Sequence, residues 1–194
     1  SLAQRIAGAA AERGLAALDA PVSGGDVGAR EARLVIMAGG DEQAYARVRP
    51  VLGLMGQNIA RLGGPGAGQF CKMANQIAVA VGMLAWAEAL AFASSAGLDP
   101  QQVWASISGG AAGSWAMTNL APRALNGNFG PGFYVKHILK DIGIALDAAA
   151  ELGVAVPGLE TARAAYERVA ANGWAENGTQ AIYRLYVERP APGR

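Results

Sequence analysis

GAGQFCKMANQIAVAVGMLAW, residues 66–86, contains a single charged side chain, Lys72, at the head of a long run of Ala, Val, Ile, Met and Leu. Gly97 supplies a stop signal after this run. The pattern predicts one long core helix over residues 69–96, with the lysine in its first turns.

The same run is not expected to cross a membrane. From Met73 to Ala87 it is shorter than the roughly 20 mostly apolar residues of a membrane-spanning helix, and it includes Asn75 and Gln76. The opening residues, SLAQRIAG, lack the basic segment and long apolar core of a signal peptide. We therefore expect no membrane partner.

Composition limits the function further. The chain has 194 residues, 52% hydrophobic and 16% charged, with a net charge of +1, and its Lys and Arg residues are scattered. A nucleic-acid-binding protein would show a clustered basic surface, so no nucleic-acid partner is expected. One cysteine, Cys71, excludes an internal disulfide and fits a reducing, cytoplasmic compartment. One cysteine and one histidine, His137, exclude a Cys/His metal cluster.

Helix signals follow one another after the glycine-rich joint at 63–68. Asp99 followed by Pro100 is an N-cap with proline at the first helical position, which predicts a helix to about Ser108. Residues 65–194 are expected to form an all-helical domain around the long helix. Its other helices are predicted over 114–126, 135–152, 157–172 and 178–188.

Residues 1–64 have a different pattern. A possible capping box of Ser1 and Gln4 opens a helix to Gly14. Strands are expected over 15–22, 33–39 and 57–63, with a helix over 42–55. Three strands and two helices hardly close a sheet with both faces and both edges covered. We therefore interpret this part as the tail of a larger α/β domain, in a chain that is mainly α.

Lys72 and Asn75 are three residues apart, so they share one face of the predicted helix. Apolar surroundings would lower the pKa of the lysine and bring proton transfer near neutral pH within reach. The amide one turn later is placed to orient a substrate hydroxyl or carbonyl. The alternative is that the ammonium reaches solvent while the amide satisfies buried backbone groups.

Two further features are candidates for ligand binding. Consecutive N–H groups at Ser23, Gly24 and Gly25 form a potential anion-binding nest where a predicted strand ends, although an ordinary glycine turn would look the same. Lys136 and Lys140 form a like-charge pair that an anion would stabilise, and Asp141 offers a local partner instead. Tryptophans are expected in helix interfaces, with Trp115 a candidate for facing a cavity.

Three motifs occur in a fixed order: DAPVSGG (19–25), G-x-G-x-x-x-K-x-x-N (66–75) and KDIGIALD (140–147). Together they resemble the β-hydroxyacid dehydrogenases, such as 3-hydroxyisobutyrate dehydrogenase and tartronate semialdehyde reductase, over residues 1 to about 188. The resemblance implies an NAD- or NADP-dependent oxidoreductase of short 3-hydroxy acids and semialdehydes. It also implies that residues 1–64 are the C-terminal remnant of a Rossmann-like α/β domain that binds the cofactor.

The resemblance also implies residue roles. Lys72 would be the catalytic acid/base. Substrate would contact Asn75 and the turn of Ser23, Gly24 and Gly25, and Lys140 would approach the cofactor. A homo-oligomer is implied as well.

The chain departs from the family pattern in one respect, and alternatives remain open. The family opens with a strand, a G-x-G-x-x-G turn and a helix, which these residues do not contain, so we expect this chain alone to be inactive. One alternative is a non-catalytic helical dimerisation or scaffold module. Another is an imine reductase or phosphogluconate-type enzyme. The motif lysine argues against the former, and the absence of an obvious basic cluster argues against the latter.

Overall fold

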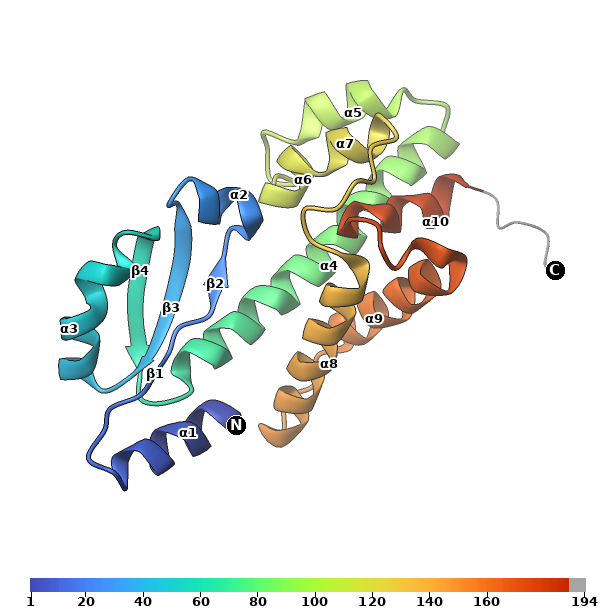
Figure 1. The fold of residues 1–194 in the computed structure, drawn as a ribbon. Coiled ribbons are helices and arrows are strands. Elements are labelled where there is room, and N and C mark those ends of the chain that lie inside the picture. The colour runs from blue at the N-terminus through green and yellow to red at the C-terminus, as the bar shows by residue number, and fades with distance from the viewer. Residues whose placement is uncertain (189–194) are drawn as a thin grey trace. The chain divides into compact units, whose positions relative to one another are not determined.

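The computed structural model describes residues 1–188 (Figure 1). These residues form two compact units, one of residues 1–75 and one that starts at residue 76. The division falls inside the long helix α4 (Ala67–Ser95), so the first turns of this helix belong to the first unit. Helices dominate and the sheet is small, which confirms a mainly α chain.

The first unit is built on the central strand β3 (Leu34–Gly40). Strand β4 (Gly56–Gly63) runs parallel to one side of β3. The short strands β1 (Leu18–Asp19) and β2 (Val22–Ser23) pair with its other side in antiparallel fashion. The helices of this unit are α1 (Leu2–Ala11), α2 (Gly25–Arg30), α3 (Glu42–Leu52) and the start of α4.

The strands and helices of this unit correspond to the expected ones with two differences. The predicted strand 15–22 is two short strands, because it is interrupted at Ala20–Pro21 and proline has no N–H to donate. The Pro21 carbonyl still accepts a hydrogen bond from Met37 N, at 3.0 Å, so the segment stays along β3. Helix α2, six residues long and opened by glycine, was not expected.

The second unit is helical and contains most of the core. After α4 come α5 (Pro100–Ile107), α6 (Trp115–Asn119), α7 (Ala121–Leu125), α8 (Val135–Glu151) and α9 (Pro157–Val169) (Figure 1). A π-helical turn (Ala170–Trp174), a 3-10 helix (Thr179–Tyr183) and α10 (Arg184–Val187) follow. Helices α8 and α9 contribute fully buried Ile138, Ile142 and Leu159.

Three predicted helices of this unit are broken in the structure. The helix expected over 114–126 divides at Leu120, just before Pro122, into α6 and α7. The helix expected to reach residue 172 changes to a π turn that contains Gly173 with φ 83°. The last predicted helix starts as a 3-10 helix.

Helix α4 has 29 residues and a window of mean hydropathy 1.8, so by length and composition it could cross a membrane. The argument that its apolar run is too short is therefore wrong. A core helix of a soluble protein meets the same criterion. In the second unit Met83, Trp86 and Leu90 of α4 are buried, and the Trp86 ring lies 5.9 Å from that of Tyr183.

Candidate functional site

Lys72 lies in the second turn of α4, in the first unit. Its side chain and that of Asn75, one turn later, are both half-buried. Helical spacing puts the two on the same face, as expected from the sequence. The structure thus places a lysine and an amide side chain together on one face of the first part of α4.

The start of α4 is held by an acid from a distant part of the chain. Asp19, in β1, accepts hydrogen bonds from Gly66 N (2.7 Å to Oδ1) and Gln69 N (2.9 Å to Oδ2). At Gly68 a methyl group would lie 2.2 Å from the Met37 carbonyl oxygen, so the helix backbone rests directly on β3. We did not expect this role for Asp19 from the sequence.

The SGG turn follows β2. Ser23 is half-buried and pairs with Val35 of β3. Gly24 and Gly25 are exposed, with φ of 130° and 64°, which only glycine adopts readily. A methyl group on Gly25 would meet no atom within 4 Å, so the backbone conformation, not crowding, requires glycine there.

Lys140 lies on α8, in the second unit, and forms an ion pair with Asp141 (2.7 Å between Nζ and Oδ1). The lysine side chain is 64% exposed, whereas that of Asp141 is 13% exposed. Gln76 Nε2 donates to the other oxygen of this carboxylate, at 2.7 Å. Lys140 therefore pairs with Asp141, the local partner that the sequence offered, while its side chain remains largely exposed.

Lys136 also has its own carboxylate. Its Nζ lies 2.7 Å from Glu176 Oε2 and 5.0 Å from the centre of the Tyr134 ring. The like-charge pair on α8 is thus compensated within the protein, and a bound anion is not needed to explain it.

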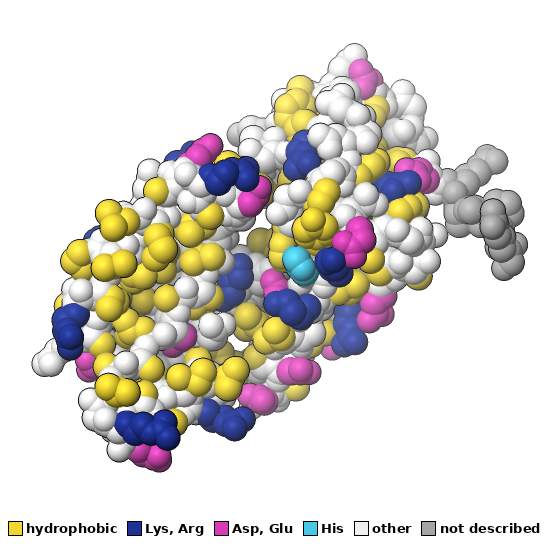
Figure 2. Space-filling view, viewed as in Figure 1, with side chains coloured by type: hydrophobic (Ala, Val, Ile, Leu, Met, Phe, Trp, Pro, Cys, Tyr) yellow, Lys and Arg dark blue, Asp and Glu magenta, His cyan; other side chains and the backbone are white. Residues whose placement is uncertain are grey.

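The structure also shows the surroundings of three other residues that the sequence analysis named. His137 is exposed, on the face shown in Figure 2, and its ring lies 5.1 Å from that of Tyr134. Cys71 is half-buried. Trp115 is 70% exposed, so the expectation that it packs in an interface is wrong. Among residues 1–188 no group of three or more His, Cys, Asp or Glu side chains is placed to hold a metal ion.

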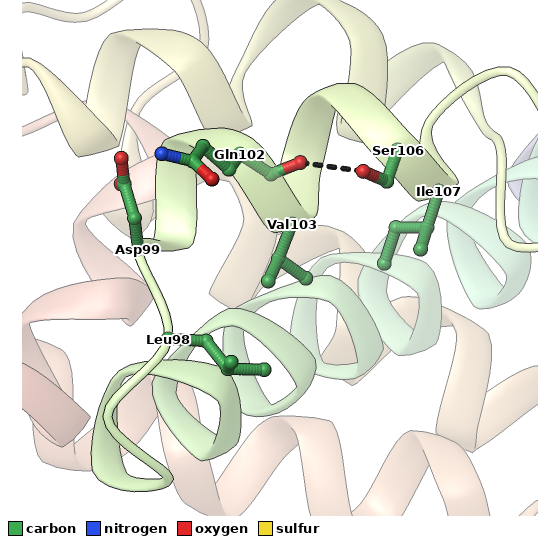
Figure 3. A pocket seen from close by; sticks show the side chains of 6 residues that line it. All are labelled: Leu98, Asp99, Gln102, Val103, Ser106 and Ile107. Carbon is green, nitrogen blue, oxygen red and sulfur yellow. Dashed lines mark hydrogen bonds between the residues drawn. The ribbon is translucent and has the colours of Figure 1, made fainter.

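A surface hollow lies along one side of α5, from Leu98 just before the helix to Ile107 at its end (Figure 3). Leu98, Val103 and Ile107 give it an apolar floor. Its polar groups are used locally, since Asp99 accepts from Gln101 N and Ser106 donates to the Gln102 carbonyl oxygen. Its lining contains no predicted site residue.

Comparison with known proteins shows the family. Residues 66–186 match the family model described as NAD-binding of NADP-dependent 3-hydroxyisobutyrate dehydrogenase. Residues 1–64 match the model for the NAD binding domain of 6-phosphogluconate dehydrogenase. The chain belongs to the β-hydroxyacid dehydrogenase family, as its three motifs indicated.

Individual relatives agree with this assignment. The uncharacterized oxidoreductase YkwC of Bacillus subtilis is 54% identical over 188 residues, which are 97% of this chain and 65% of that protein. The 2-hydroxy-3-oxopropionate reductase of Escherichia coli is 46% identical over 156 residues, 80% of this chain and 53% of that protein. These relatives are named as oxidoreductases and give the non-catalytic alternative no support.

A solved structure extends the agreement to the fold. The 3-hydroxyisobutyrate dehydrogenase of Mycobacterium tuberculosis, solved with L-serine, is 36% identical with a TM-score of 0.88. The match covers 96% of this chain and 66% of that one. The chain thus spans about half to two thirds of the length of the relatives that it matches.

Proposed function

We propose that this chain contributes the acid/base and substrate-binding residues of an NAD(P)-dependent oxidoreductase of short 3-hydroxy acids and semialdehydes. The observation that carries the proposal is a half-buried Lys72, in the second turn of a helix whose start is anchored by Asp19. Family membership and the names of the relatives support the same reaction class.

Lys72 is the proposed proton carrier. In reduction its ammonium gives a proton to the oxygen of the developing alkoxide, and in oxidation the neutral amine takes the hydroxyl proton. Asn75 shares its helix face and can hold the same oxygen or a neighbouring one. Ser23 and the backbone of Gly24 and Gly25 are proposed to bind the carboxylate end of the substrate.

A nicotinamide dinucleotide, when bound, supplies or accepts the hydride. Of the described residues, Lys140 is the one proposed to approach it. Two observations support that role: the Lys140 side chain is largely exposed, and its ammonium pairs with Asp141. We propose residues 1–64 as part of the dinucleotide-binding domain, and residues 65–194 as the substrate and dimerisation domain. A cytoplasmic homo-oligomer is part of the same proposal.

A substrate panel tests the reaction class. The intact protein is given tartronate semialdehyde, methylmalonate semialdehyde and the matching 3-hydroxy acids, each with NAD(H) and NADP(H), and nicotinamide absorbance is followed. We expect turnover of at least one pair with at least one cofactor. Tartronate semialdehyde is the favoured substrate, because the sequence resembles tartronate semialdehyde reductase. Chain-length-matched acids without a 3-hydroxyl group are the control and should stay unreacted. No turnover across the panel would contradict the proposal.

A further inference from the structure

Asp19 has an unusual set of partners for a half-buried acid. Both of its carboxylate oxygens accept backbone N–H groups from a segment 47 to 50 residues further along the chain, Gly66 and Gln69. By contrast, Asp41 and Asp99 each accept an N–H from the start of the helix that follows them directly. Asp19 thus caps a helix to which no local sequence links it.

Two close backbone contacts accompany the cap. A methyl group on Gly68 would lie 2.8 Å from Asp19 Oδ2 as well as against β3. A methyl group on Gly39 would lie 2.6 Å from Asp19 Oδ1 and 2.7 Å from Gly68 N. Because the two glycines have no side chains, the backbone at the start of the helix packs directly against the strand and the Asp19 carboxylate. This close packing fixes the position and the rotation of the helix start.

Lys72 follows Gln69 by three residues, which is just under one helical turn. The turn that Asp19 holds therefore leads directly into the turn that carries Lys72. We infer that Asp19 is a positioning residue for Lys72: its carboxylate holds the first turn of α4 against β3 and so sets where the ammonium stands. This inference rests on the proposed function of Lys72.

The same short segment also carries the SGG turn. Asp19 pairs with Gly39 on β3 and Ser23 pairs with Val35, so both residues are held to one strand. The proposed substrate turn and the anchor of the acid/base helix are therefore four residues apart and fixed to the same support. A shift of this segment would move both.

An NMR titration of lysine side chains tests the inference without depending on turnover. The sequence has only three lysines, at 72, 136 and 140, so their signals can be assigned with Lys→Arg variants. In Asp19→Asn the amide oxygen can still accept one N–H, while the negative charge and one hydrogen bond are lost. The positive end of the helix dipole is then uncompensated, and the pKa of Lys72 should fall by about 0.2 to 0.7.

Asp41→Asn is the matched control, because it makes the same charge-removing substitution at the cap of α3 in the same unit, where the amide oxygen can still accept the Ala44 N–H. This variant should leave the pKa of Lys72 unchanged. Amide hydrogen exchange at Gly66 and Gln69 should accelerate in Asp19→Asn and not in Asp41→Asn. In the intact protein the alkaline limb of the reduction profile should move to lower pH in Asp19→Asn, with kcat about tenfold to a hundredfold lower.

The outcomes separate this inference from the function on which it rests. If Lys72→Ala abolishes turnover but Asp19→Asn leaves both the lysine titration and the pH profile unchanged, the positioning role is wrong and the proposed function stands. An equal change in Asp41→Asn would also overturn the role, since a general loss of stability would then explain the result. Full turnover of Lys72→Ala would instead overturn the proposed function.

Discussion

The two units of this chain are stabilised in different ways. In the first, the large buried apolar side chains among the described residues all lie on β3, namely Leu34, Ile36 and Met37, and helices α1 and α3 bury none. In the second, buried side chains come from α4, α8, α9 and the final turns. The first unit therefore depends more on backbone contact and capping around α4, and the second on side-chain packing.

The largest expected effect concerns packing. Ile138 of α8 is fully buried, whereas Ile6 of α1 is 54% exposed. Ile138→Ala should lower the free energy of unfolding by about 2 to 5 kcal/mol, because it removes buried methyl groups and leaves a cavity. Ile6→Ala should stay within about 0.5 kcal/mol. Denaturant melts of both variants check this, and equal losses would contradict the contrast between the units.

A glycine pair on one helix sharpens the comparison. A methyl group on Gly68, in the first unit, would clash with the Met37 carbonyl oxygen, while one on Gly82, in the second, would meet no atom within 4 Å. Gly68→Ala should cost about 1 to 3 kcal/mol because backbone must shift. Gly82→Ala should gain about 0.5 to 1 kcal/mol through helix propensity. Thermal melts of the two variants should move in opposite directions, and a tolerated Gly68→Ala would refute the backbone contact.

The smallest expected effect is a change in folding stability at alkaline pH, and it arises in the second unit. Burial, the Glu88 charge and a hydrogen bond to that carboxylate raise the pKa of Tyr186 to about 12, from 10.0. The folded state thus keeps this proton longer than the unfolded state. Its contribution to stability is complete below pH 10 and is lost as pH rises through 12. Tyr186→Phe should therefore lose less stability than the wild type over this range, as pH-dependent melts would show; equal losses would contradict the assignment.

Much of the fold could be predicted because its signals are local. The apolar run of β3, the caps Asp41 and Asp99, and the stop at Gly97 each act within a few residues of the element they define. Two of the errors occurred at Pro21 and Pro122, where a periodic pattern continued across a residue that interrupts backbone hydrogen bonding.

The site was predictable to a smaller extent. The spacing of Lys72 and Asn75 and the exposure of the glycine turn follow from local sequence and motif. The anchoring by Asp19 does not, because it joins positions 47 and 50 residues apart, and such contacts are set by how strands and helices pack. The sequence allowed two partners for Lys140, a bound anion or Asp141. The short distance to Asp141 in the structure shows that the local carboxylate is the partner.

One measurement tests the central claim most directly: turnover of Lys72→Ala in the intact protein, with cofactor binding measured alongside. The account predicts a loss of about 10² to 10⁴-fold in kcat, the usual share of a general acid/base, with cofactor affinity nearly unchanged. Lys136→Ala, which removes an exposed lysine already paired with Glu176, is the control and should turn over normally. Rapid turnover by Lys72→Ala would contradict the account.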